Sequence, residues 1–358
     1  MKENDFIYES NQVIKGQVKW IAPSNIALVK YWGKKNVQLP ENPSISFTLS
    51  NSITNTEVIY SLKKRKKEFV DFDYFFEGNP KKEFDTKIQL FFNRIQKYVP
   101  WIKNFYFKIN SNNSFPHSSG IASSASFMAS LSLCLMDIEK NLFPEMKLDY
   151  FNNKASFLSR LGSGSASRSI KGPICIWGSS PSLKNSNDYY AVELGRNIHD
   201  VFKSYRDTIL IIDDKKKKIS SSKGHDLMKN HPFSNQRIIQ SNENFDSLIH
   251  ILKTGDLESF IKIVELEALS LHALMMTSNP SYILIKPETL NAINKIIDFR
   301  ETTKTPICFT LDAGPNLHLL YPENFSSKVL DFINSELKIH CKKGKFILDK
   351  VGDGARKI

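Results

Sequence analysis

Two segments of the chain combine glycine, serine and basic residues in patterns that could bind phosphate groups. In NSFPHSSGIASSA, at 113–125, Gly120 lets the backbone approach a ligand closely, and the helix expected after it presents unpaired N–H groups and a positive dipole end. Serine hydroxyls add donors to phosphate oxygens or a ligand to Mg²⁺. The segment therefore predicts an anion site for a nucleoside triphosphate, although Gly and Ser are also ordinary loop and cap residues. It matches neither the Walker loop nor the dinucleotide fingerprint.

The second segment, GSGSASRS at 162–169, places two glycines and four serines around Arg168. A guanidinium held in such a turn, beside hydroxyl and backbone donors, suits bidentate recognition of a carboxylate or a phosphate. The alternative is a flexible polar turn whose arginine faces solvent.

Lys30 and Asp312 are the two charged residues whose surroundings are least typical of a charge. Lys30 lies in the apolar run at 26–32, which alternates as a strand, and a lysine there is costly unless it lines a cleft or meets a carboxylate. Asp312 lies where an apolar run enters the turn sequence AGPN, so its carboxylate could face a cleft. It could equally cap the turn through its own backbone.

The elements that must position these residues form two different patterns along the chain. The first half reads as strands followed by helices, with expected strands at 18–21, 26–32, 45–49, 56–62, 69–76, 105–109 and 173–177, and helices from 121 to 136 and over 150–161. After a polar linker at 179–188, strands at 208–213, 307–312 and 316–321 alternate with helices at 245–253, 257–276, 287–299 and 326–337. The pattern predicts an α+β fold in two lobes, 1–183 and 184–358.

Composition excludes several classes of protein. Of 358 residues, 41% are hydrophobic and 24% are charged, which is ordinary for a globular protein and argues against disordered, collagen-like and disulfide-scaffold chains. No window of 18 apolar residues is present and the N-terminus is too polar for a secretory signal, so we expect a cytoplasmic protein without a membrane span. The four scattered cysteines favour reduced, buried thiols over zinc or disulfides.

The net charge of +12 leaves the kind of partner open, because anionic substrates and nucleic acids both select basic proteins. Much of the surplus lies in the runs at 63–67 and 215–218, which follow expected strands. We interpret both runs as solvated hairpin tips. A nucleic-acid patch is the alternative, although no nucleic-acid-binding motif accompanies them.

Taken together and in this order, the segments resemble the diphosphomevalonate decarboxylase family, within the superfamily of galacto-, homoserine, mevalonate and phosphomevalonate (GHMP) kinases. The matching stretches are APSNIALVKYWGK, NPSISFTLS, FPHSSGIASSAS, GSGSASRS and LDAGPN, which extend from about Trp20 to Tyr321. The resemblance implies an N-terminal S5-domain-2-like lobe that binds ATP and a C-terminal ferredoxin-like lobe. It also implies ATP- and Mg²⁺-dependent conversion of mevalonate 5-diphosphate to isopentenyl diphosphate, in isoprenoid biosynthesis.

By the same resemblance, three residues are expected to be catalytic. Asp312 matches the carboxylate that accepts or orients the proton of the 3-hydroxyl group. Lys30 matches the lysine that pairs with this aspartate, which would explain a cation in an apolar strand. Arg168 matches the arginine that binds the substrate carboxylate.

Further positions match the ligand sites of the family. The substrate diphosphate site corresponds to Tyr31, Trp32, Gly33, Lys34, Ser163, Gly164, Ser165 and Ser222. The ATP site corresponds to Gly120, Ser123, Ser124 and Ser221, with Ser124 the expected Mg²⁺ or γ-phosphate contact. The resemblance also implies a homodimer.

The sequence departs from the family pattern in places. His117-Ser118-Ser119 replaces the usual Thr-Ala-Ala, and a diphosphate-binding arginine falls near Lys87. Loss of the bidentate arginine would weaken diphosphate binding, which leaves a monophosphate substrate open. The alternatives are therefore a related GHMP small-molecule kinase or decarboxylase acting on mevalonate or its monophosphate and, from another class, a basic nucleic-acid-binding protein.

Overall fold

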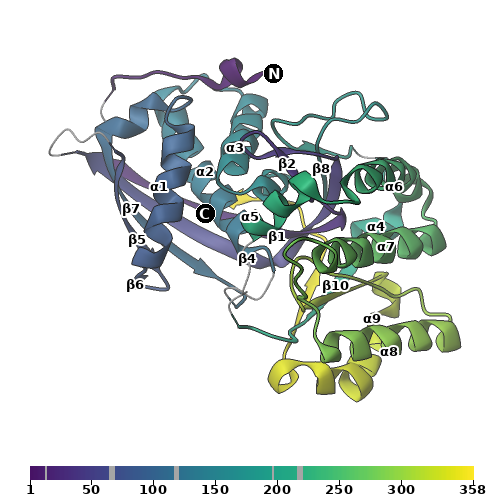
Figure 1. The fold of residues 1–358 in the computed structure, drawn as a ribbon. Helices are drawn as coiled ribbons and strands as arrows, with labels where there is room; N and C mark the ends of the chain where they lie inside the picture. The colour runs from purple at the N-terminus through teal and green to yellow at the C-terminus, as the bar shows by residue number, and fades with distance from the viewer. Residues whose placement is uncertain (13, 64–68, 117–120, 196, 216–220) are drawn as a thin grey trace.

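The computed structural model describes residues 1–12, 14–63, 69–116, 121–195, 197–215 and 221–358, without the side chains of Ser221 and Ser222. Two β-sheets with helices packed on them form two lobes, which confirms the predicted α+β class (Figure 1). The predicted lobe boundary at 183/184 stays a prediction.

The first sheet has eight strands within the described ranges, and only β5 and β7 pair in parallel. Its order is β14-β1-β4-β7-β5-β6, with β8 on β4 and β9 on β8. The strands are β1 Gly16–Val29, β4 Ser44–Leu62, β5 Asp71–Phe76, β6 Asn79–Pro80, β7 Phe105–Asn113, β8 Ile174–Trp177, β9 Val192–Glu193 and β14 Arg356–Lys357. The short strands β2 Lys34–Lys35 and β3 Leu39–Pro40 form a separate pair.

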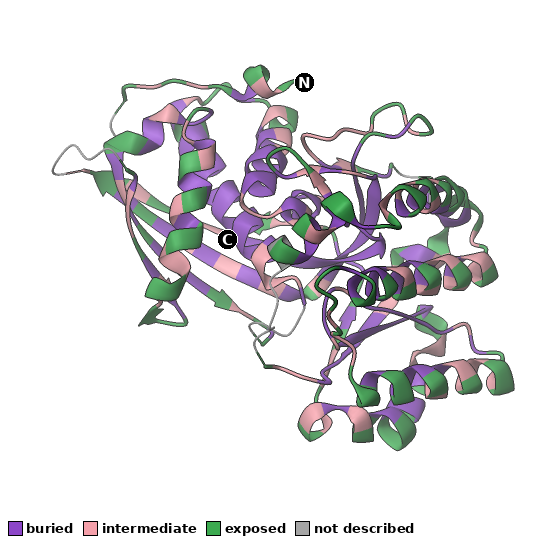
Figure 2. Ribbon diagram, in the orientation of Figure 1, coloured by how far each residue is buried: buried purple, intermediate pink, exposed green. Residues whose placement is uncertain are grey.

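Three helices cover one face of this sheet: α1 Asp85–Ile95, α2 Ser123–Leu142 and α3 Leu148–Gly162 (Figure 1). Helix α2 is buried over almost its whole length, so its serines need internal partners (Figure 2). Ser126 and Ser130 find them on β4, at 2.6 Å from the hydroxyls of Thr54 and Thr56. These hydroxyl pairs fix the register of α2 on the sheet.

The second sheet has the order β11-β12-β10-β13 and is antiparallel throughout. Its strands are β10 Arg206–Leu210, β11 Cys308–Thr310, β12 Leu317–Tyr321 and β13 Phe346–Lys350. The helices of this half are α4 Asp200–Lys203, α5 Ser221–Asp226, α6 Ser234–Thr254, α7 Leu257–Met276, α8 Pro287–Thr303 and α9 Ser326–Phe332, which continues as a π-helix at Ile333–Leu337. Short 3₁₀ turns lie at Glu3–Phe6, Lys82–Phe84, Pro100–Asn104, Gly164–Ser169, Leu227–Asn230, Glu323–Phe325, Lys338–His340 and Lys342–Gly344.

Helices α6 and α7 pack on the part of β1 that leads to Lys30. Their tight connection has a local cause: Gly255 ends α6 in the left-handed region at φ +80°, and the Asp256 carboxylate caps α7 by accepting from the Ser259 N–H. From Ile21 to Val29 every residue of β1 is buried, and α2 packs against the strand as well.

The two lobes are joined by more than this apolar contact. Asp349 on β13 is buried and accepts the backbone N–H groups of Ser50, Asn51 and Ser52, on β4, at 2.7–2.9 Å. The chain then returns to the first sheet as β14, which pairs with β1. The carboxylate therefore links one sheet to the other close to the end of the chain.

One prediction from the sequence was wrong in detail. Lys30 does not belong to a strand: β1 ends at Val29, after a register shift between Ala27 and Val29, and Lys30 is the next residue. The basic runs at 63–67 and 215–218, which we interpreted as hairpin tips, fall almost entirely within 64–68 and 216–220, outside the described ranges. The described strands on either side of the first run, β4 and β5, are not neighbours in the sheet, because β7 lies between them.

The expectations about cysteines and membranes can be compared directly with the structure. Each of the four cysteines is a described residue, and all four are buried and free of disulfides. None of the described helices combines the length and apolar character needed to cross a bilayer.

Candidate active site

The predicted meeting of Lys30 and Asp312 is confirmed. Lys30 follows β1 of the first sheet, and Asp312 lies two residues beyond β11 of the second. The ammonium Nζ lies 3.1 Å from Asp312 Oδ1. The lysine side chain is only 2% exposed, whereas that of the aspartate is 28% exposed. The carboxylate is therefore the member of the pair that a ligand can reach.

Electrostatics at this pair depend on a balance between burial and charge. Burial lowers the pKa of Lys30, while the charge and hydrogen bond of Asp312, and then the charge of Glu267, raise it. Arg168 lowers it further, so the arginine is near enough for its charge to act on the lysine. Lys30, Arg168 and Asp312 are therefore brought into one electrostatic cluster by segments from both lobes.

Arg168 is 2% exposed, and the alternative of a solvent-facing arginine is wrong. Its guanidinium donates to Ser44 Oγ at 2.7 Å, to Ser46 Oγ at 3.1 Å and to Asn25 Oδ1 at 3.4 Å. All three acceptors are neutral, and in the described part of the chain no carboxylate lies within ion-pair distance of it. Burial lowers the pKa of Arg168 to about 10, although the Asp312 charge opposes this shift. A buried cation of this kind favours an anionic ligand.

Asn25 fixes the side of Arg168 that faces β1. Its amide nitrogen donates to the Ser165 carbonyl at 3.1 Å and to the Ser169 hydroxyl at 2.7 Å, which turns its oxygen toward the guanidinium. Ser165, one of the predicted substrate contacts, is therefore held through its backbone while its partly exposed side chain stays available.

The segment 31–33 is more buried than a ligand-lining segment would require. Tyr31 and Trp32 are 8% and 5% exposed, and both rings pack on His225 of α5, with ring centroids 4.4 and 4.5 Å apart. The Gly33 N–H donates to His225 Nδ1 at 3.0 Å, at a φ of +103° that favours glycine. Burial lowers the pKa of His225 well below its usual range, which keeps Nδ1 an acceptor. Segment 31–33 is therefore held firmly in place by its packing on α5.

Lys34 directly follows this segment and lies in a group of positive charges. Burial, together with the nearby charges of Arg94 and Lys87, lowers the pKa of Lys34 to about 8, although the Asp226 charge opposes this shift. Arg94 and Lys87 both lie on α1, and Arg94 Nη1 donates to the Leu161 carbonyl at 2.9 Å. Repulsion among these three cations would be relieved by a bound polyanion.

The turn at 162–169 meets the start of α2. Ser163 Oγ lies 3.1 Å from Ser124 Oγ, so a predicted diphosphate contact and a predicted ATP contact are adjacent. Gly164 is buried where a Cβ would approach Tyr31 and Trp177 atoms to 2.9 Å. The turn therefore requires glycine at this position, because there is no space for a Cβ atom.

Within the described residues no side chain caps the start of helix α2, which leaves N–H groups of its first turn for a ligand. Its N-cap residue Ala122 has φ +46° and makes no side-chain cap bond, and Ser123 and Ser124 of the first turn are partly exposed. Hydroxyls and backbone donors suit the phosphates of ATP, and the Ser124 hydroxyl suits Mg²⁺ in company with phosphate oxygens and water. The described residues therefore fit both groups.

Some of the expected ligand contacts lie where the structure describes no side chain. Gly120 and His117 lie in the range 117–120, which is outside the described residues. Ser221 and Ser222 open helix α5, but their side chains are not described. Across the described residues no cluster of three or more His, Cys, Asp or Glu side chains forms a metal site of its own.

Sequence reasoning missed the residues that orient the predicted ones. Ser44 and Ser46 belong to the stretch NPSISFTLS, where alternation in a strand places both on one face, a signal that could have paired them with a buried charge. Arg94 and His225 carried no such signal, because each contacts its partner only after two distant elements have packed.

Comparisons with known proteins agree over most of the chain. The model of the diphosphomevalonate decarboxylase-like N-terminal domain matches residues 22–189, and that of the mevalonate 5-diphosphate decarboxylase C-terminal domain matches residues 208–354. The diphosphomevalonate decarboxylase of Candida albicans is 28% identical over 326 residues, which cover 87% of this chain and 86% of that protein.

Solved structures show the same fold. The mevalonate diphosphate decarboxylase of Staphylococcus aureus is 27% identical with a TM-score of 0.81, and the match covers 96% of this chain and 98% of that one. MDDEF in complex with MVAPP, AMPPCP and magnesium is 26% identical with a TM-score of 0.80, covering 96% and 99%. The predicted two-lobed architecture is confirmed by these matches. The chain belongs to the diphosphomevalonate decarboxylase family of the GHMP superfamily.

Proposed function

We propose that this protein catalyses the ATP-dependent decarboxylation of (R)-mevalonate 5-diphosphate to isopentenyl diphosphate, with release of ADP, phosphate and CO₂. The observation that carries the proposal is the buried Arg168, bonded to neutral acceptors and close to the Lys30–Asp312 pair. A site that offers one carboxylate to a hydroxyl group and one guanidinium to an acid suits a hydroxy acid as substrate. The family membership and the MVAPP complex of MDDEF support the same substrate.

In the first step Asp312 would accept or orient the proton of the tertiary 3-hydroxyl group. The hydroxyl oxygen forms a bond to the γ-phosphorus of ATP as the bond from that phosphorus to ADP breaks. Lys30 supports the charge of Asp312 from the buried side, so the carboxylate stays available as an acceptor. Catalysis in this step is mainly positioning and electrostatics, as is general for phosphoryl transfer.

In the second step Arg168 would hold the substrate carboxylate while the C1–C2 bond breaks. The electron pair of that bond becomes the C2–C3 double bond, the 3-phosphate departs with the C3–O bond pair, and C1 leaves as CO₂. The substrate carboxylate loses its negative charge in this step. In a site closed to water a charged carboxylate is unfavourable, and the nearby guanidinium offsets that cost until CO₂ leaves. Ser44, Ser46 and Asn25 keep the guanidinium in a fixed plane.

The substrate diphosphate would bind to Lys34, supported by Arg94 and Lys87 and by the predicted contacts of Tyr31 to Gly33, Ser163 to Ser165 and Ser222. The presence of several cations offsets the missing arginine near Lys87 and favours the diphosphate over the monophosphate. ATP would bind at the start of α2 through Gly120, Ser123 and Ser124, with Ser221 nearby and Ser124 toward Mg²⁺. When bound, ATP supplies the phosphoryl group, and Mg²⁺ neutralises its phosphates.

Two other functions remain as alternatives to be tested. A GHMP kinase acting on mevalonate or its monophosphate would need Asp312 and Lys30 but gains nothing from a buried guanidinium such as Arg168. A basic nucleic-acid-binding protein would use the charge of +12 and show binding that weakens steeply with salt.

The test is a substrate panel of mevalonate, its 5-phosphate and its 5-diphosphate, each with ATP and Mg²⁺. We expect ADP, CO₂ and isopentenyl diphosphate in equal amounts from the diphosphate only. Accumulation of an intact 3-phosphorylated acid would favour the kinase. Salt-sensitive DNA or RNA binding without turnover would favour the third function.

The lobe boundary and the oligomeric state can be tested separately from the reaction. We propose that residues 1–183 form most of the ATP-binding lobe and residues 184–358 most of the second lobe, with β9 and β14 returning to the first sheet. Limited proteolysis can test this boundary. We also propose a homodimer in solution, and sedimentation at micromolar concentration measures it directly.

A further inference from the structure

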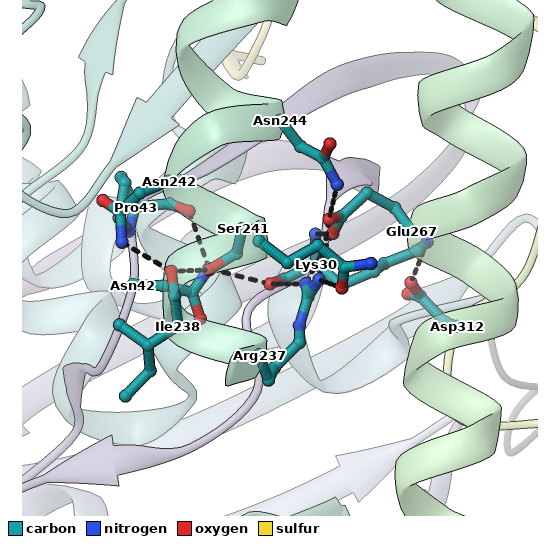
Figure 3. A network of polar contacts seen from close by, with 11 residues as sticks. Lys30, Asn42, Pro43, Arg237, Ile238, Ser241, Asn242, Asn244, Glu267 and Asp312 are labelled. Atoms are coloured by element: carbon teal, nitrogen blue, oxygen red, sulfur yellow. Dashed lines mark hydrogen bonds and ion pairs between the residues drawn. The ribbon is translucent and has the colours of Figure 1, made fainter. Parts of the chain in front are cut away.

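The backbone of Lys30 is held by three side chains from other elements. Its N–H donates to Glu267 Oε2 at 2.8 Å, and its carbonyl oxygen accepts from Asn42 Nδ2 at 3.0 Å and Arg237 Nη2 at 3.3 Å (Figure 3). Lys30 lies just past the end of β1, where no ladder holds its peptide groups. These contacts therefore replace the sheet in fixing where the lysine side chain starts.

Glu267 is completely buried on α7, and both its oxygens are fully used. Arg237 of α6 donates to Oε1 at 2.7 Å and to Oε2 at 2.5 Å, and Asn244 donates to Oε1 at 2.6 Å. A buried ion pair of this kind is a poor source of stability, because the cost of removing both charges from water offsets their attraction. Its geometry has another consequence: the carboxylate directs one of its four bonds at the lysine backbone.

The same helix also contacts the partner of Lys30. His272 of α7 is 2% exposed, and its Nε2 lies 3.1 Å from the backbone carbonyl oxygen of Asp312. Because a carbonyl oxygen can only accept, Nε2 is the donor in this bond. His272 lies five positions after Glu267, which is about 7.5 Å along the helix axis. One helix therefore contacts both members of an ion pair whose residues lie 282 positions apart.

We propose that Glu267 and His272 are positioning residues that together set the place of Lys30 against Asp312, with Arg237 holding Glu267 in position. The proposal rests on the proposed function, since it assigns to α7 the alignment of the two residues that act on the 3-hydroxyl group. Figure 3 shows the Glu267 part of this arrangement: the Glu267 side chain extends from α7 toward Arg237 of α6, with Lys30 beside it and Asp312 next to α7.

A charge effect separates this role from a purely structural one. Among the described residues, the groups that bear charge around Lys30 are Asp312, Glu267 with Arg237, Arg168, and Asp207 of β10. The Glu267 charge raises the pKa of Lys30. Loss of that charge therefore lowers the pKa of the lysine, so its ammonium is lost at a lower pH as pH rises. The alkaline limb of kcat should move to lower pH.

The first experiment compares Glu267→Gln with Glu265→Gln in mevalonate 5-diphosphate turnover. Glu265 is a matched control on the same helix: it pairs with Arg300 at 2.6 Å and bonds neither Lys30 nor Asp312. For Glu267→Gln we expect kcat about 10- to 150-fold lower with both KM values within about 3-fold, and an alkaline limb at lower pH. Glu265→Gln should lower the Tm and leave the limb in place. Equal effects of the two substitutions on kcat and on the limb would overturn the proposal.

His272 provides a second test that holds if Glu267→Gln fails to fold. His272→Leu removes the donor to the Asp312 carbonyl and should lower kcat about 10-fold. His272→Gln keeps a donor at a similar place and should recover kcat to within about 3-fold of the wild type. The alkaline limb should stay in place in both, since His272 contacts the Asp312 backbone. Equal losses in the two variants would contradict a positioning role.

Crystal structures of the variants separate failure of this proposal from failure of the proposed function. If the wild-type protein releases no CO₂ from mevalonate 5-diphosphate, the proposed decarboxylase function is rejected, independently of the positioning role of α7. The distance from Lys30 Nζ to Asp312 Oδ1, 3.1 Å in the native chain, needs no activity to be measured. It should lengthen beyond hydrogen-bond range in His272→Leu or Glu267→Gln, and an unchanged distance in both would overturn the positioning role.

Discussion

Substitution of Arg168 by lysine keeps the charge and removes the geometry on which the carboxylate site depends. The guanidinium now bonds three oxygens on two strands, those of Ser44, Ser46 and Asn25. One ammonium group on a shorter side chain cannot reach all three and also bind an acid in bidentate fashion. Loss of one charge-assisted hydrogen bond to the substrate costs about 1.5–3 kcal/mol, which is a fall in kcat/KM of about 10- to 150-fold.

Arg160→Lys is the matched control for this experiment. Arg160 is also fully buried, and it donates to the carbonyl oxygens of Tyr189 and Val37 at 2.8 Å, away from the Lys30–Asp312 pair. Both substitutions should lower the Tm, because each strands buried acceptors at about 1–3 kcal/mol. Only Arg168→Lys should lower kcat/KM by more than about 10-fold in a coupled assay of ADP release. Equal kcat/KM values for the two variants would refute the assignment of Arg168 to the substrate carboxylate.

Three further predictions follow from the same geometry. Asp312→Asn removes the proton acceptor and should lower kcat about 10²–10⁴-fold, while ATP binding measured by calorimetry stays close to normal. Retained turnover in this variant would reject the role of Asp312. Because the pKa of Lys34 is lowered to about 8, its ammonium is present below that pH and lost as pH rises through it. The KM for mevalonate 5-diphosphate should therefore rise above pH 8, and Lys34→Gln should raise KM at pH 7 and flatten this rise. Gly164→Ala should cost about 1–3 kcal/mol in urea unfolding, since the new Cβ meets Tyr31 and Trp177; unchanged stability would contradict the close packing.

Much of the fold was predictable because its elements have strong local patterns. Helix α7 was expected at 257–276 and lies at Leu257–Met276. The long strands β1 and β4 were each expected as two short ones, because polar residues interrupt their apolar runs. In β1 the interruption at Pro23–Asn25 is a register shift within a continuous strand. In β4 the interruption at 50–52 is where Asp349 accepts three backbone N–H groups. Asp349, the residue that keeps β4 continuous, therefore lies about 300 positions further along the sequence.

The candidate site shows the same division between local signal and distant packing. Lys30 and Asp312 were predictable because each violates its local pattern, a cation in an apolar run and an acid at a strand end. Glu267 and Arg237 were not, because a Glu or an Arg in an amphipathic helix ordinarily faces solvent. Their burial depends on α6 and α7 packing together against the end of β1, which only the folded chain shows.

The decisive measurement is a crystal structure of the complex with mevalonate 5-diphosphate. We expect the substrate carboxylate to lie on the Arg168 guanidinium in bidentate contact, with the 3-hydroxyl group within hydrogen-bond distance of an Asp312 carboxylate oxygen. A substrate bound with its carboxylate away from Arg168, or with its hydroxyl group out of reach of Asp312, would show that these two residues do not have the roles proposed for them.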